Sequence, residues 1–77
     1  MINRIGEVLK EKKAGNKDLV KFLEVKKSTV SRWVHNKQQP TLTTLSRIAE
    51  FLRVDIRELL YPSDWSNSQI EGFKVKK

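Results

Sequence analysis

Short apolar stripes at helical spacing, separated by residues that end helices, constrain the fold of this chain most. The first stripe recurs at intervals of three and four residues and consists of Ile2, Ile5, Val8 and Leu9. It predicts an α-helix over about residues 2–13, and Gly15 and Asn16 interrupt the pattern after it.

Two short helices are expected next, with only three residues between them. Their stripes are Leu19, Val20 and Leu23 within residues 16–23, then Val30, Trp33 and Val34 within residues 27–34. Asn36 follows the helix over residues 27–34 and tolerates the left-handed conformation that often closes a helix. Phe22 stands at a position where it either covers the edge of the core or belongs to a partner surface.

Two further helices are expected in the second half of the chain. The stripe of the longer one consists of Leu42, Leu45, Ile48, Ala49 and Leu52, with Thr41 as its N-cap. A short last helix begins at Asp55, which with Glu58 resembles a capping box, and Pro62 ends it. The sequence therefore predicts an all-α, compact five-helix domain over residues 1–61.

Residues 62–77 differ from the rest because they are polar and have no helical period. We expect a C-terminal tail that is loose, or is partly ordered through Trp65 or Phe73. Phe51, Tyr61 and Trp65 either form a dimer patch or fold the tail back on the domain. The final lysines, Lys74, Lys76 and Lys77, are a solvated end or add non-specific affinity for DNA.

The charge of the chain favours an anionic partner. Sixteen lysines and arginines against nine acidic residues give a net charge of +7, and residues 25–49 contain no acidic residue. The alternative is a solvated basic face that only keeps the protein in solution.

Other function classes find little support in the sequence. The chain has no cysteine and one histidine, His35, so we expect no metal site and no cofactor. It has no paired carboxylates, Ser-His-acid set or glycine-rich phosphate loop, so we expect no enzyme. It has no apolar run long enough for a membrane span or signal peptide, and we expect a cytoplasmic, nucleoid-associated protein.

The segments 16–23 and 27–34, with a turn at residues 24–26, match the spacing of a helix-turn-helix. One side of the second helix must anchor it on the core, while the other offers hydrogen-bonding groups to base edges. That outer side is predicted to carry Lys27, Ser28, Ser31 and Arg32. Lysine and arginine pair well with guanine O6 and N7, and serine tolerates several bases.

The run from Leu19 to Pro40 resembles the Cro/cI-type (lambda repressor-like, XRE) helix-turn-helix family. The family pattern is L-A-x-x-L-G-V-S-x-S-T-I-S-x-I-E-x-G-x-x-x-P, and the spacing here is gapless. Later matches to its fourth and fifth helices are Leu45, Ile48, Ala49, Leu52, Val54, Glu58 and Leu59. The resemblance implies a DNA-binding regulator of bacterial or phage type.

The resemblance also implies roles for individual residues. Lys27, Ser28 and Arg32 fall where the family contacts bases, and Asn16 falls where a phosphate is bound. The whole set expected at the DNA backbone is Asn16, Lys17, Lys26, Thr29, His35, Asn36 and Lys37, of which Lys17 and Lys26 are placed by charge alone. The resemblance further implies a homodimer on a palindromic double-stranded operator, with a possible RNA polymerase contact.

Two other functions stay open at this point. One is an antitoxin-like interaction module, in which the tail from Tyr61 onward binds a protein and DNA binding is secondary. The other is RNA binding, against which the lack of exposed aromatic platforms on residues 27–34 counts.

The chain departs from the family pattern at three positions. Glu24 replaces the glycine of the turn, and a left-handed non-glycine residue costs roughly 1 kcal/mol or more. Lys26 stands where serine or threonine usually caps the helix over residues 27–34, and the lost cap costs on the order of 1 kcal/mol. Arg53 replaces another common glycine. We expect these changes to alter the turns and not the fold.

Overall fold

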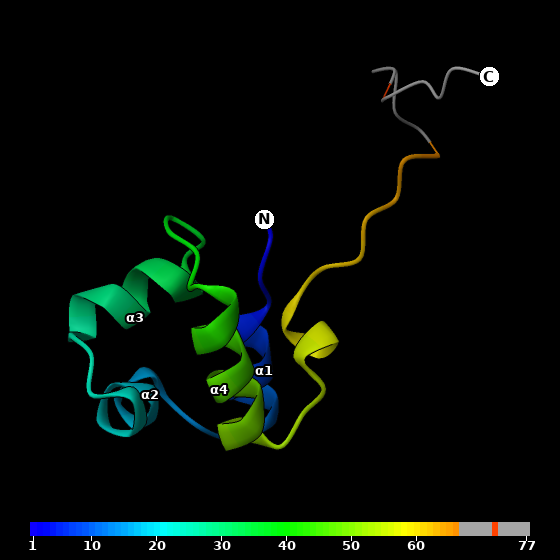
Figure 1. Ribbon diagram of the computed structural model, residues 1–77. Helices are drawn as coiled ribbons and strands as arrows, with labels where there is room; N and C mark the ends of the chain where they lie inside the picture. Colours follow the sequence, from blue (N-terminus) through cyan, green and yellow to red (C-terminus); the bar gives the residue numbers. More distant parts are fainter. Residues whose placement is uncertain (67–71, 73–77) are drawn as a thin grey trace.

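The computed structural model describes residues 1–66 and 72, and Figure 1 shows its helices. The elements are α1 (Ile5–Glu11), α2 (Asn16–Leu23), α3 (Lys27–Val34), α4 (Leu42–Leu52) and the 3-10 helix η1 (Ile56–Leu59). The all-α class is confirmed. The five-helix count is not confirmed in the described residues, where four α-helices are followed by the short 3-10 helix η1.

Local hydrogen bonds explain why η1 stays short. The Asp55 side chain accepts from the Arg57 N–H (2.8 Å), where a capping box with Glu58 was expected. Leu60 then returns to extended backbone and forms an isolated antiparallel bridge with Asn3. A residue that pairs in this way cannot continue a helix.

The same bridge corrects the first predicted helix, which was expected over residues 2–13. The two hydrogen bonds beside the bridge run from Arg4 N–H to Leu59 O (2.8 Å) and from Tyr61 N–H to Ile2 O (3.0 Å). Residues 2–4 pair with the segment after η1 and are not helical, so α1 begins at Ile5. Ile2 consequently lies outside the helix and is exposed.

Left-handed residues follow all four α-helices in the described part of the chain. They are Lys13 (φ 57°), Glu24 (φ 54°), Asn36 (φ 57°) and Arg53 (φ 56°). The expected conformation of Asn36 is confirmed, Glu24 keeps the left-handed conformation of the turn glycine that it replaces, and α1 is closed by Lys13 and not by Gly15. The predicted N-cap of α4 is also confirmed, because Thr41 Oγ1 accepts from Thr44 N–H (3.2 Å).

The core takes side chains from all of these elements. Its buried members are Ile5, Val8, Leu9, Leu19, Leu23, Val30, Trp33, Leu45, Ile48, Ala49, Leu52 and Leu59. Trp33 is 5% exposed, so its predicted place in the core is confirmed. Val34 packs against this core where α3 approaches α1, and a Cβ at Gly6 would lie 3.0 Å from Val34 Cγ1. Gly6 thus permits the close approach of the two helices.

Phe22 of α2 and Phe51 of α4, two aromatic residues left open by the sequence, stack on each other. The rings of Phe22 and Phe51 stack with their centroids 4.5 Å apart, and the Arg47 guanidinium lies 5.4 Å from the Phe22 centroid. Both side chains remain 36% exposed, so the two alternatives for Phe22, the core edge and a partner surface, stay predictions.

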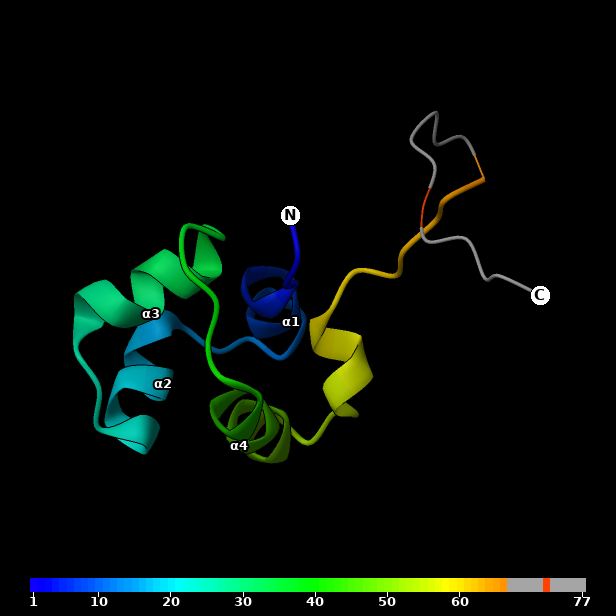
Figure 2. The same ribbon diagram turned by 45° about the horizontal axis from the view of Figure 1, so that its top comes forward.

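Tyr61 attaches the start of the tail to α1. Its hydroxyl donates a hydrogen bond to Glu7, and the Arg4 guanidinium lies 5.9 Å from the centre of its ring. Beyond it, Pro62–Ser66 leave the helical body in both Figure 1 and Figure 2, and Trp65 is 77% exposed. The predictions for Phe73, Lys74, Lys76 and Lys77 lie outside the described residues.

Candidate nucleic-acid interface

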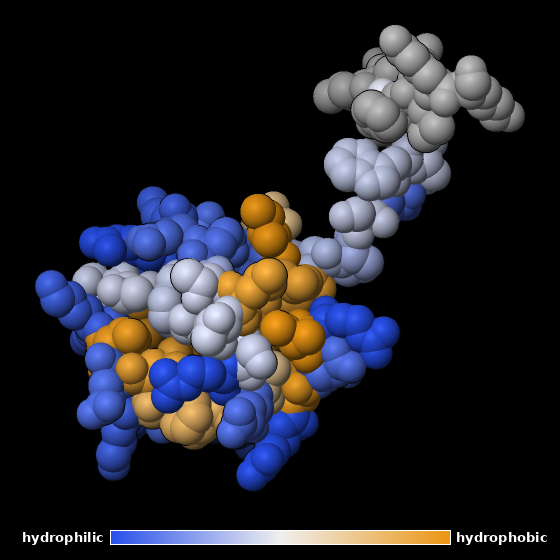
Figure 3. Space-filling view, viewed as in Figure 1, coloured by the Kyte–Doolittle hydropathy of each residue, from blue (hydrophilic) through white to orange (hydrophobic). Residues whose placement is uncertain are grey.

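The helices α2 and α3 have the arrangement expected of a helix-turn-helix. They are joined by residues 24–26 and pack against each other at one side of the molecule (Figure 2). Val30 and Trp33 anchor the inner side of α3 in the core. The outer side carries the four residues predicted to contact bases, of which Lys27, Ser28 and Arg32 are exposed and Ser31 is half-buried. Hydrophilic side chains predominate at the upper left of Figure 3, where α3 lies, with some apolar ones below them.

The start of α3 has the features anticipated from its departure from the family pattern. Lys26 occupies the N-cap position with extended backbone, and its side chain makes no capping hydrogen bond. Its carbonyl accepts from Thr29 N–H at 3.0 Å, so only the backbone closes the first turn. The partial positive charge of a helix N-terminus and the cations Lys26 and Lys27 therefore coincide. Such an end attracts an anion, above all a phosphate.

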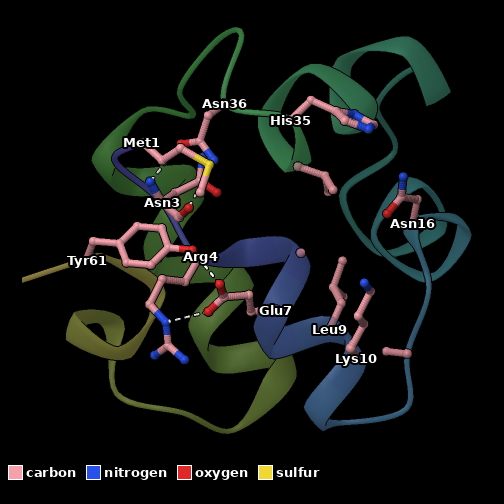
Figure 4. A pocket seen from close by; sticks show the side chains of 13 residues that line it. Met1, Asn3, Arg4, Glu7, Leu9, Lys10, Asn16, His35, Asn36 and Tyr61 are labelled. Carbon is pink, nitrogen blue, oxygen red and sulfur yellow. Dashed lines mark hydrogen bonds and ion pairs between the residues drawn. The ribbon is translucent and has the colours of Figure 1, made fainter.

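Several residues predicted to contact the DNA backbone border one groove. This groove of about 440 Å³ lies between the N-terminal segment, α1, the start of α2 and the end of α3. Figure 4 shows Asn16 and His35 on one side of it, with Asn3, Asn36 and Tyr61 on the other. Lys10, which the sequence analysis did not select, also lines it. Of the remaining predicted backbone contacts, Lys17, Lys26 and Lys37 are exposed and Thr29 is half-buried.

The hydrogen bonding of His35 leaves one ring nitrogen for a ligand. His35 Nδ1 lies 2.9 Å from the carbonyl oxygen of Ser31. Because a carbonyl oxygen only accepts, Nδ1 carries the proton, and Nε2 is the ring nitrogen left for a ligand; a phosphate oxygen also only accepts, so it pairs with Nε2 only when that nitrogen carries a proton as well.

The cations around α3 are free of protein carboxylates. Among residues 1–66 and 72, the ion pairs involve only Arg4, with Glu7 and Glu11, and Arg57, with Asp55. All of them lie on α1 or beside η1, away from α3. Lys26, Lys27, Arg32 and Lys37 thus present their charge to solvent within the described part of the protein.

The Asn36 side chain makes several hydrogen bonds within the protein. Its Oδ1 accepts from the N–H groups of Ile2 (3.0 Å) and Asn3 (2.8 Å) and from Gln39 Nε2 (3.3 Å). Its Nδ2 donates to the carbonyl of Asn3 (3.0 Å). These bonds use the Oδ1 and one of the two N–H groups of Nδ2, and the predicted contact of Asn36 with the DNA backbone stays a prediction.

Asn3 and Gln39 are functional candidates that the sequence analysis missed. Asn3 is 2% exposed, and its Nδ2 donates to the carbonyl of Trp33 (2.9 Å) and to Gln39 Oε1 (2.7 Å). Its Oδ1 accepts from Ile5 N–H at 3.0 Å. No periodicity marks such residues, because the bonds that join Asn3 to Trp33 and Gln39 span 30 or more positions along the chain.

Membrane-spanning helices and metal-ligand clusters are both absent from the described residues. No helix within residues 1–66 is long and apolar enough to cross a membrane. No group of three or more potential metal ligands was found in the same part of the chain.

Comparison with known proteins agrees with this geometry. The profile of the Cro/C1-type HTH DNA-binding domain matches residues 4–64. The fold is similar to the crystal structure of a candidate DNA-binding protein from Bacteroides fragilis, with a TM-score of 0.76 and 44% identity, over 79% of this chain and 100% of that one. No curated protein shows significant similarity. By the extent of the profile match, the chain belongs to the Cro/C1-type helix-turn-helix DNA-binding domain family.

Proposed function

We propose that the protein is a sequence-specific regulator of transcription of bacterial or phage type, which acts as a repressor or as a restriction–modification controller. In this proposal α3 enters the major groove of duplex DNA and touches base edges. The observation that carries it is the outer side of α3, where Lys27, Ser28 and Arg32 are exposed and no acidic side chain of the described residues pairs with the cations. Lys27 and Arg32 suit guanine O6 and N7, and Ser28 and Ser31 suit several bases.

Contacts to phosphates position α3 in the groove. Side chains at the start of α2 and α3 and in the loop after α3 are proposed for this role: Asn16, Lys17, Lys26, Thr29, His35 and Lys37. Asn16, Lys17 and Lys26 precede α3 in the sequence, Thr29 lies in its first turn, and His35 and Lys37 follow it. Groups at both ends of α3 suit contacts with the two DNA backbones that border one groove. Such contacts supply affinity and register but carry no direct sequence information.

We further propose that two copies bind a palindromic operator. Exposed apolar side chains outside the helix-turn-helix support a protein contact, since Ile2 is 60% and Leu42 is 76% exposed. Figure 3 shows apolar side chains gathered over the region between α4 and η1. A second copy that covers this face would place two α3 helices on two half-sites, and the distance between the half-sites reports the dimer geometry. A contact with RNA polymerase would then decide between activation and repression.

Selection of bound sequences from random duplex DNA tests the proposal. A sequence-specific dimer returns one palindromic site, whereas a non-specific cation returns no consensus. On the selected site, Arg32→Ala is expected to change the preferred base at one position. Lys37→Ala is expected to weaken all sequences alike and to reduce the salt slope by about 1.

The control variant is Arg57→Ala. Arg57 is an exposed cation on η1, at the opposite side of the molecule from α3 in Figures 1 and 2. Arg57→Ala removes one positive charge, as Arg32→Ala does, and it should leave the preferred bases unchanged. If Arg32→Ala leaves both affinity and base preference unchanged, the proposed base-contacting face is wrong.

A further inference from the structure

The N-terminal segment and the loop after α3 are joined by an amide cluster, which consists of Asn3, Asn36 and Gln39. We propose that this cluster positions the end of α3 and the following loop for sequence discrimination. The inference rests on the proposed function and deepens it. Asn3, Asn36 and Gln39 are positioning residues, and none of them needs to touch DNA.

The cluster joins three parts of the chain through hydrogen bonds. Asn3 Nδ2 binds the carbonyl of Trp33 in the last turn of α3, and the same amide group binds Gln39 Oε1 in the loop. The Asn36 amide pairs with both the N–H and the carbonyl of Asn3, as a neighbouring strand would. The free edge of the N-terminal segment is thus occupied by a side chain of the loop.

On its other edge the same segment is held by the bridge to Leu60. Residues 2–4 therefore lie between the loop after α3 and the end of η1, and they connect the interface to the side of the domain opposite α3. Asn3 is 2% exposed, and no buried side-chain polar atom in residues 1–66 lacks a partner. A buried and fully satisfied polar network specifies one arrangement, because each alternative leaves a polar group unpaired.

The loop that the cluster holds carries groups of the interface. Lys37 N–H donates to the carbonyl of Arg32 (2.9 Å), and Asn36 N–H donates to the carbonyl of Trp33 (3.0 Å). The loop therefore folds back over the last turn of α3, beside Arg32 and His35. A change in the loop alters the position of a proposed base contact and of two proposed phosphate contacts together. Base contacts tolerate displacements of only about 0.5 Å.

Two variants test the cluster. Asn36→Gly removes the amide but keeps the backbone conformation, since glycine adopts a φ of 57° without strain. Asn3→Ala removes the bonds to Trp33 and Gln39 from the other side. The control is Leu52→Val, which lowers stability in the core of α4 without touching the cluster. All proteins are measured at a temperature where circular dichroism shows them folded.

The first readout needs no DNA. Hydrogen exchange of the Asn3 and Lys37 amides should become about tenfold faster in Asn36→Gly, because local opening then breaks fewer bonds. Leu52→Val should leave the exchange of both amides by local opening unchanged. Wild-type protection of both amides in Asn36→Gly and Asn3→Ala would overturn the proposal.

The second readout is the ratio of affinities for the selected duplex and for a duplex with one base pair changed at the Arg32 position. A protein that is only less stable loses affinity for both duplexes equally, so the ratio stays constant. We expect the ratio to fall about tenfold in both cluster variants, as when one good base contact is lost. An unchanged ratio in both variants, with specific binding by the wild type, would overturn the positioning role alone. If the wild-type protein selects no sequence, the proposed function and this role both fail, whereas the exchange result still decides whether the cluster holds the loop.

Discussion

The first turn of α3 offers a substitution that should raise stability and lower affinity for DNA. Lys26 occupies the N-cap with φ −73° and ψ 147°, and its side chain caps no N–H group. A serine in this backbone conformation places its hydroxyl where it accepts from Thr29 N–H, at the third position of the helix. Lys26→Ser also removes a cation from the positive end of the helix dipole.

The size of the gain follows from these two contributions. A side-chain N-cap contributes about 1 kcal/mol, within a range of about 0.5–2. Removing an unfavourable charge next to the dipole adds about 0.3–1 kcal/mol at low ionic strength. The sum of about 1.5 kcal/mol corresponds to a rise in Tm of roughly 6–12 °C for a domain of this size.

The same substitution is expected to weaken DNA binding, because Lys26 is one of the proposed phosphate contacts. Losing one neutralised phosphate makes the slope of log Kd against log salt less steep by about 0.9. Thermal melts by circular dichroism and binding titrations at several salt concentrations measure the two effects. Lys26→Ala is the matched control: it loses the charge and the affinity but gains no cap, so its Tm should rise much less.

The results that refute this reasoning are distinct. If Lys26→Ser both melts higher and binds DNA more tightly, Lys26 does not contact phosphate. If its Tm equals that of Lys26→Ala, the serine does not cap α3.

Three further substitutions probe the fold. Glu24→Gly relieves the left-handed backbone of the turn and should stabilise the protein by about 0.5–1 kcal/mol net, after the greater freedom of unfolded glycine is subtracted; an unchanged denaturation midpoint would contradict it. Leu59→Ala empties a fully buried position of η1 and should cost about 2–5 kcal/mol in urea unfolding, and a loss below about 1 would mean that η1 packs loosely. Hydrogen bonds from Tyr61 and Arg4 lower the pKa of the Glu7 carboxyl, so its contribution to stability is present near neutral pH and is lost as the pH falls through the lowered pKa. The Tm of Glu7→Gln should therefore fall less than that of the wild type between about pH 5 and pH 3. Parallel curves of Tm against pH for the two proteins would show that the contacts of Glu7 do not contribute to stability.

The sequence alone determined the helices whose signals are local. Apolar spacing predicted α2 and α3 with the bounds that the structure has, and it placed Val30 and Trp33 in the core. The cap at Thr41 also followed from its residue type and spacing, whereas the left-handed turn at Glu24 was suggested only by the family resemblance. Such features depend on bonds within a few residues, which explains why a single sequence reveals them.

The tertiary structure alone decided the ends of the domain and the support of α3. Ile2 continues the apolar period of α1, yet residues 2–4 are not helical. Their backbone pairs with that of Leu60, which directly follows η1 and lies more than 50 positions away along the chain. Asn36 looked like a simple helix-closing residue, but its amide holds the N-terminal segment. Hydrogen bonds across more than 30 residues leave no periodic trace in the sequence. They depend on which polar groups the packed helices bring together, and only the folded arrangement determines that.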